Sequence, residues 1–249
     1  MSLLKKYVML SCVLTFSILV KAETYVVSVG IAKYKNIPSL TLPENDAKTI
    51  ASIYKTRTKK VITMTGRYAT RNNIIKVLSA QFKRAKKGDM VLFFFSGHGY
   101  EGGFCPYDMD NNGRNALSYN DIYKVFKQSG ATRKIIMADA CMSGGLRQKQ
   151  SGNHHFYHKK SDVVLFLSSR TKEFSMESKK MRNGYFTTYL AKGLRGTADF
   201  DRNRKVTAKE IYTYVSKKVK TVCNNKQHPV MWGNFRDNLV MIDWKHYFV

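Results

Sequence analysis

Two apolar segments of this chain each run directly into a stretch of small residues that carries one reactive side chain. The first is 91–99, with His98 between two glycines, and the second is 134–145, with Cys141 shortly before a pair of glycines. Continuous apolar runs of this kind are typical of strands buried on both faces of a parallel sheet. Ligands of such sheets bind beyond the carboxyl ends of the strands. His98 and Cys141 can therefore face one site if the two strands are neighbours.

The residue types suit nucleophilic catalysis. A thiol with a pKa near 8.5 is mostly protonated at neutral pH, and an imidazole with a pKa near 6.5 can take its proton or hold the thiolate as an ion pair. Backbone N–H groups at Gly99 and Cys141 can stabilise an oxyanion. A lone cysteine or histidine is more often an ordinary core residue. The two together, in matched settings, predict a cysteine hydrolase with His98 as base and Cys141 as nucleophile.

The segments 96–99 and 139–144 resemble the caspase-like clan of cysteine peptidases, and within it the metacaspases and bacterial caspase-like proteins. Asp139 stands where animal caspases have Gln before Ala-Cys, so the pattern is not that of an animal caspase. The resemblance covers nearly the whole chain after residue 22, through 25–31, 45–47, 163–169 and 184–187. It implies a cysteine endopeptidase with a three-layer α/β/α fold, whose mainly parallel six-stranded sheet has an antiparallel last strand.

The pattern along the chain agrees with an α/β fold. Apolar runs predict strands at 24–31, 60–64, 90–96, 133–138 and 162–168. Apolar residues spaced three and four apart predict helices at 45–54, 72–85, 119–127, 185–194 and 208–220. Thr70, Ser118 and Thr207 are candidate helix caps. This alternation favours a parallel sheet between two layers of helices, and we expect 238–243 to be the last strand.

The first 22 residues resemble a secretory signal peptide. Lys5 and Lys6 precede an apolar stretch at 7–19, and a small-residue cleavage pattern ends before Glu23. We therefore expect a peptidase domain at 23–249 that is exported, either periplasmic or secreted. The apolar stretch is short for a membrane span, and an uncleaved anchor is the alternative.

The cysteines do not form a disulfide framework. Removal of the first 22 residues would leave Cys105, Cys141 and Cys223. Three thiols fit reduced or catalytic cysteines better than a set of disulfides. A bond between Cys105 and Cys223 stays open at this point.

The chain is strongly basic, with a formal net charge of +26 at pH 7. Such a surface favours polyanions, anionic lipid headgroups or acidic proteins. The cations are dispersed, with local clusters at 55–60, 83–87 and 217–220, and no nucleic-acid-binding module is present in the sequence. A second hypothesis is therefore a non-catalytic caspase-like protein that holds a polyanion or a protein partner through its basic surface.

The metacaspase resemblance assigns Asp46, Ser96 and Asp139 to a substrate pocket for Arg or Lys. Buried carboxylates are costly unless a cation pairs with them, which agrees with that assignment. Pro43 and Glu44 stand where metacaspases have Gly-Cys, so the pocket departs from the family pattern there. The polar, basic segment 144–162 is predicted to be a flexible loop, and related peptidases often cleave themselves in the corresponding loop.

One further segment is similar to a calcium loop. Asp199, Asp201, Asn203 and Glu210 occupy ligand positions of an EF-hand loop, but Arg204 stands where the turn needs glycine. We read this segment as a helix-joining loop with calcium as the alternative, and the sequence predicts no required cofactor.

Overall fold

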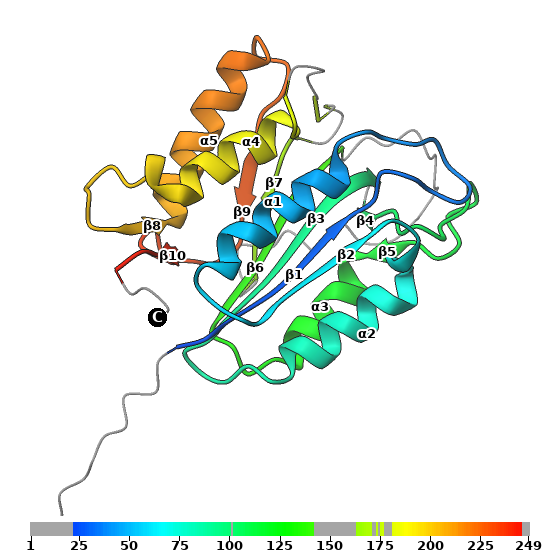
Figure 1. Ribbon diagram of the computed structural model, residues 1–249, viewed down its shortest axis with the longest axis horizontal. Coiled ribbons are helices and arrows are strands. Elements are labelled where there is room, and N and C mark those ends of the chain that lie inside the picture. Colours follow the sequence, from blue (N-terminus) through cyan, green and yellow to red (C-terminus); the bar gives the residue numbers. More distant parts are fainter. Residues whose placement is uncertain are drawn as a thin grey trace, which may run out of the picture.

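The chain folds around one central sheet with helices on both faces (Figure 1). This computed structural model describes residues 22–100, 102–141, 163–170, 173, 175–176 and 181–245. The six strands of the main path, in spatial order, are β2 (Val61–Thr65), β1 (Thr24–Gly30), β3 (Met90–Tyr100), β6 (Arg133–Cys141), β7 (Val163–Leu167) and β9 (Val230–Trp232). Every pair along this path is parallel except β7 with β9. The fold is thus the expected mainly parallel sheet with an antiparallel last strand.

In the described ranges, five α-helices cover the two faces of the sheet. They are α1 (Pro43–Lys55), α2 (Arg71–Phe82), α3 (Tyr119–Lys127), α4 (Tyr185–Lys192) and α5 (Ala208–Val222). In Figure 1, α2 and α3 lie on one face while α1, α4 and α5 lie on the other. One 3-10 turn, η1 (Gly66–Tyr68), follows β2, and one π-helical turn, η3 (Gly193–Thr197), continues α4. The three-layer α/β/α architecture is confirmed.

The apolar strands supply side chains to two separate cores because successive residues of a strand point to opposite faces. In β3, Phe93 and Phe95 pack in the core beneath α2 and α3, whereas Leu92 and Phe94 pack in the core beneath α1, α4 and α5. A slip of one residue would exchange the two sets, so the buried pattern fixes the register that places the strand ends.

Three predicted caps define where helices begin. The Thr70 hydroxyl accepts the N–H of Asn73 at 3.3 Å. Ser118 forms a reciprocal capping box with Asp121, and Thr207 forms one with Glu210. Each box satisfies backbone N–H groups that the first turn leaves without a helical partner.

The identity of the last strand was predicted wrongly. The segment expected there contains β10 (Val240–Asp243), which pairs antiparallel with β8 (Lys205–Thr207) in a separate two-stranded sheet. Its apolar residues, Met241 and Ile242, fill the core under α1 and α5 instead of extending the main sheet. The actual edge strand, β9, has three half-buried residues, too few to give a strand signal in the sequence.

The strands β3 and β6 are longer than predicted. We expected His98 and Cys141 in turns after the strands, but both residues lie within the strands themselves. The extension of β3 has a clear cause, because its last residues pair antiparallel with β4 (Gly103–Phe104), which in turn pairs with β5 (Leu117–Ser118).

Cys105 and Cys223 are both buried as free thiols. They belong to the cores on opposite faces of the sheet, so the disulfide left open by the sequence does not form. None of the helices in the described ranges is long and apolar enough to span a bilayer. The expected loop at 144–162 and the segment 1–21 lie outside the described residues.

Candidate active site

His98 and Cys141 lie opposite each other on neighbouring strands. The register of β3 with β6 pairs His98 directly with Cys141, as it pairs Ser96 with Asp139. Neighbouring strands are about 4.8 Å apart, so the two backbones can present their side chains to one site. The side chain of Cys141 lies outside the described residues. The two strands are therefore neighbours in the sheet, as expected, and their backbones bring the two residues side by side.

The ring of His98 is oriented by a backbone carbonyl. Its Nε2 lies 2.9 Å from the oxygen of Pro38, in the loop that joins β1 to α1. A carbonyl oxygen can only accept, so this contact requires the proton on Nε2. The neutral ring then has Nδ1 as its basic nitrogen. Burial lowers the pKa of His98, against the raising effect of the Pro38 carbonyl, which favours this neutral form.

Tyr34 holds His98 from a second side. The backbone N–H of His98 donates to the Tyr34 hydroxyl at 2.7 Å, and the two ring centroids are 5.0 Å apart. Gly97 makes this approach fit, because a Cβ there would lie 2.5 Å from the Tyr34 hydroxyl oxygen. Burial raises the pKa of Tyr34 well above its ordinary value, so the hydroxyl stays protonated.

Asp46 lies at the start of α1, against the end of β3. Its Oδ2 accepts the Ser96 hydroxyl at 2.8 Å. Its Oδ1 accepts the side-chain amide of Asn183 at 2.8 Å and the N–H of Gly184 at 3.1 Å. The side chain is thus fully enclosed, with the residue only 1% exposed.

Asp139 is enclosed in a similar way on β6. Its Oδ2 accepts the N–H and the hydroxyl of Thr187 at 3.0 and 2.7 Å, and its Oδ1 accepts the hydroxyl of Ser175. Gly184 packs against this carboxylate so closely that a Cβ would lie 2.5 Å from Oδ2. The structure thus brings Asp46, Ser96 and Asp139 together, and their role in binding substrate stays a prediction.

The two carboxyl groups influence each other. Burial, followed by the charge of Asp139, raises the pKa of Asp46 to about 8. Burial also raises the pKa of Asp139, against the lowering effect of its Ser175 and Thr187 hydrogen bonds. At neutral pH the pair therefore holds fewer than two negative charges. A cation that entered this site would favour ionisation of both groups.

The position of Gly99 differs from the open turn expected for an oxyanion site. Gly99 is buried and pairs with Phe104 across the short antiparallel ladder of β3 and β4. It nevertheless adjoins His98, whose carbonyl accepts the N–H of Cys105 at 2.9 Å. The short ladder therefore fixes the backbone beside the candidate base.

In the loop that resembles a calcium site, 199–210, the acidic side chains accept backbone N–H groups of the same loop. Carboxylate oxygens of Asp199, Asp201 and Glu210 lie within 4.8 Å of one another. Asp199 accepts the N–H groups of Asn203 and Arg204 at 3.0 and 2.8 Å, and Glu210 caps α5. Arg204 has a left-handed φ of 64°, at the position where the calcium loop uses glycine. These contacts account for the geometry of the loop that leads into α5.

Several site residues were not singled out in the sequence. Tyr34 and Pro38 come from the β1–α1 loop, which carries no motif. Asn183 and Ser175 come from connections after β7. Gly184 and Thr187 fall within a segment that contributed to the family resemblance, so a signal existed there without a role attached to it.

A family model for the caspase domain matches residues 24–240. Among solved structures, protein GSU0716 from Geobacter sulfurreducens matches with a TM-score of 0.68 and 15% identity, over 91% of this chain and 100% of that one. A structure of pro-sf-caspase-1 matches with a TM-score of 0.64 and 16% identity, over 89% of this chain and 95% of that one. These distant likenesses show the fold. No curated protein matches the chain.

The family match spans most of the chain, and the sheet order and structural likenesses agree with it. The resemblance seen in the sequence is thereby confirmed, and this chain belongs to the caspase domain family of cysteine peptidases, which act on protein substrates.

Proposed function

We propose that this protein is a cysteine endopeptidase in which His98 and Cys141 form the catalytic dyad. The observation that carries the proposal is the pairing of these two residues across β3 and β6, with the imidazole held through Nε2 by the Pro38 carbonyl. A neutral, oriented imidazole beside a cysteine is the arrangement that nucleophilic catalysis requires.

In the proposed mechanism, Nδ1 of His98 accepts the proton of the Cys141 thiol, and the thiolate attacks the scissile carbonyl carbon. The N–H groups of Gly99 and Cys141 stabilise the resulting oxyanion. His98 then gives its proton to the leaving amine as the C–N bond breaks, which leaves a thioester on Cys141. Water, activated by His98, hydrolyses the thioester and restores the thiol.

We propose Arg or Lys as the residue before the scissile bond. Support comes from Asp46 and Asp139, two carboxyl groups whose pKa values are raised by burial. A guanidinium or ammonium group would compensate their charge with charge-assisted hydrogen bonds. Ser96 would hold Asp46 in place through the hydroxyl contact that they already share.

Export and self-cleavage are further parts of the proposal. The signal-peptide pattern before Glu23 supports export with removal of residues 1–22. Intact-mass analysis of the exported protein tests this removal, and a mass that includes residues 1–22 would contradict it. The basic residues of segment 144–162 support cleavage there by the proposed specificity, which N-terminal sequencing of the incubated chain beside Cys141→Ala tests.

The experiment that tests the function is a positional peptide library incubated with the purified chain, with Cys141→Ala as control. We expect cleavage after Arg or Lys by the parent and none by the variant. Equal cleavage by both proteins would contradict the peptidase assignment, and the binding-protein hypothesis would then remain. Selection of Asp in place of Arg would contradict only the pocket.

The same library resolves the role of the acids. In Asp46→Asn, discrimination between Arg and its neutral isostere citrulline should fall about tenfold to a hundredfold, the range given by charged hydrogen bonds. Unchanged discrimination in both Asp46→Asn and Asp139→Asn would show that the pocket lies elsewhere.

A further inference from the structure

The end of the sheet opposite the candidate active site is densely basic. The loops before β2, β3 and β6 gather at this end, where the chain also enters β1 (Figure 1). Parallel strands require this arrangement, because all their amino ends lie at one edge. We call the cationic residues of these loops the basic edge: Lys55, Arg57, Lys59, Lys60, Lys83, Arg84, Lys86, Lys87, Lys127, Arg133 and Lys134.

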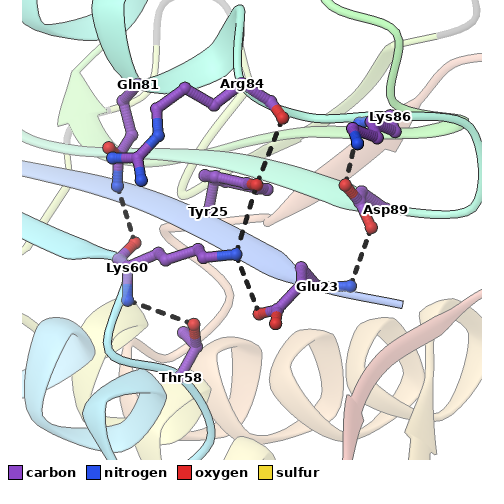
Figure 2. A network of polar contacts seen from close by, with 8 residues as sticks. All are labelled: Glu23, Tyr25, Thr58, Lys60, Gln81, Arg84, Lys86 and Asp89. Atoms are coloured by element: carbon purple, nitrogen blue, oxygen red, sulfur yellow. Dashed lines mark hydrogen bonds and ion pairs between the residues drawn. The ribbon is translucent and has the colours of Figure 1, made fainter. Parts of the chain in front are cut away.

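The loops of the basic edge are joined into one surface. Figure 2 shows the network at its centre, where Lys60 contacts the carboxylate of Glu23 at 3.4 Å and the hydroxyl of Tyr25 at 3.3 Å. The Tyr25 hydroxyl donates to the carbonyl of Arg84 at 3.2 Å. The α3–β6 loop adjoins the α2–β3 loop, since a Cβ on Gly130 would lie 2.9 Å from a carbonyl of the latter. The backbone segments that carry the cations therefore lie against one another.

The acids of these loops do not neutralise the exposed cations. Asp89 is buried and accepts backbone N–H groups from Glu23 and Lys86, both at 2.8 Å. Glu23 pairs with Lys60. In the described part of the chain, no carboxylate lies within ion-pair distance of these exposed residues: Lys55, Lys59, Lys83, Arg84, Lys86, Lys87 and Lys127. Like charges held together repel one another unless a counter-charge compensates them.

Two features indicate a lipid surface as the source of that counter-charge. The apolar segment 7–19 directs the chain to a membrane whether it is later removed or retained, and the described chain that follows it enters β1 at this edge. A protein that bound single-stranded nucleic acid would use exposed aromatic rings as stacking platforms. The exposed large hydrophobic residues among those described, Tyr68, Phe200 and Tyr212, all lie outside these loops.

We propose that the basic edge docks this protein on an anionic phospholipid surface. The candidate active site then faces away from the bilayer, because it lies at the carboxyl edge of the same sheet. Each lysine or arginine near an anionic surface strengthens partitioning about fivefold.

The test compares two variants of the chain 23–249, both of equal charge, for binding to vesicles, so that the apolar segment 7–19 is absent from both. K83Q/K86Q/K87Q removes three cations of the basic edge, and K76Q/K217Q/K218Q removes three exposed cations from α2 and α5. We expect the wild type to bind vesicles of phosphatidylcholine mixed with phosphatidylglycerol more tightly than vesicles of phosphatidylcholine alone. The basic-edge variant should lose about a hundredfold in this preference, and the control variant much less.

Raising the salt from about 0.05 to about 0.5 M should remove the preference, because salt screens the attraction between surface charges. Equal binding to both vesicles, or equal loss in both variants, would overturn the proposal. So would duplex DNA that displaces the protein at a phosphate concentration equal to that of the vesicles, because the edge would then be a nucleic-acid surface. Matching thermal unfolding of both variants shows that folding is not the cause of a loss.

Discussion

At the scale of single residues, His98 is held at two points by residues that lie far from it in the sequence. Tyr34 accepts its backbone N–H, and Pro38 accepts its ring N–H. Neither partner can itself transfer a proton at neutral pH in these contacts. Tyr34 is therefore a positioning residue, whose effect on catalysis should pass through the placement of the imidazole.

Tyr34→Phe should lower kcat about tenfold with little change in KM, because the phenyl ring keeps the packing but loses the acceptor for the His98 N–H. Steady-state kinetics on an Arg peptide measures kcat and KM separately. Tyr25→Phe is the matched control, since it also removes one hydroxyl with a hydrogen bond, at the opposite edge of the sheet. Equal effects of the two substitutions on kcat would contradict the positioning role.

Asp46 makes folding stability depend on pH in a direction opposite to that of an ordinary acid. With its folded pKa at about 8, the folded chain keeps a proton that the unfolded chain loses above about pH 4. Its contribution to the free energy of unfolding therefore falls as pH rises between these values. As pH rises from about 5 to about 8, the free energy of unfolding of Asp46→Asn should fall less than that of the wild type. Urea denaturation at each pH measures both. An equal or larger loss in Asp46→Asn would contradict the raised pKa.

At the scale of elements, helix starts and buried strands could be predicted because their causes are local. Thr70, Ser118 and Thr207 mark the starts of their helices, because each side chain accepts a backbone N–H three residues further on. Continuous apolar runs in the sequence predict the central strands. The edge strand β9 could not be found this way, since its three residues gain their structure from pairing with β7.

The same distinction explains the candidate site. Asp46, Ser96 and Asp139 fall in short motifs, so the resemblance to metacaspases could predict that they lie in one site. The contacts of Tyr34, Ser175 and Asn183 depend on how loops from distant parts of the chain cross the strand ends. No local pattern encodes such a crossing, and only the folded chain reveals it.

Ser118→Ala should lower the free energy of unfolding by about 1 kcal/mol, the usual effect of losing a helix cap. The capping box would lose the hydroxyl that accepts the N–H of Asp121 at 3.1 Å. Peptidase activity should change little, because the Ser118 hydroxyl contacts Asp121 and the backbone pairing of β5 with β4 does not use it. Chemical denaturation tests this, and Ser118→Thr should restore most of the loss. A stability equal to that of the wild type in Ser118→Ala would show that the box contributes nothing.

At the scale of the whole molecule, the two edges of one sheet have different chemistry. The carboxyl edge holds His98, Cys141 and the buried acids, while the amino edge carries the dense positive charge. Cys105 and Cys223 are buried beside the carboxyl edge, with exposed fractions of 0% and 3%. This division predicts which cysteine reacts.

Iodoacetamide at neutral pH should modify Cys141 far faster than Cys105 or Cys223. Burial raises the pKa of Cys105 to about 12, and burial together with the charge of Asp139 raises that of Cys223 to about 11, so neither offers a thiolate. Peptide mapping by mass spectrometry measures the three rates in the folded chain. Faster labelling of either buried thiol than of Cys141 would contradict the division, and denatured protein provides the control in which all three react.

The most direct test of the account is kcat/KM on an Arg peptide for the wild type, Cys141→Ala and His98→Ala. We predict that each substitution lowers it by at least about a thousandfold, because each removes a group that takes part in bond making or proton transfer. The free energy of unfolding should change little in both variants. Turnover within about tenfold of the wild type in either folded variant would contradict the catalytic dyad.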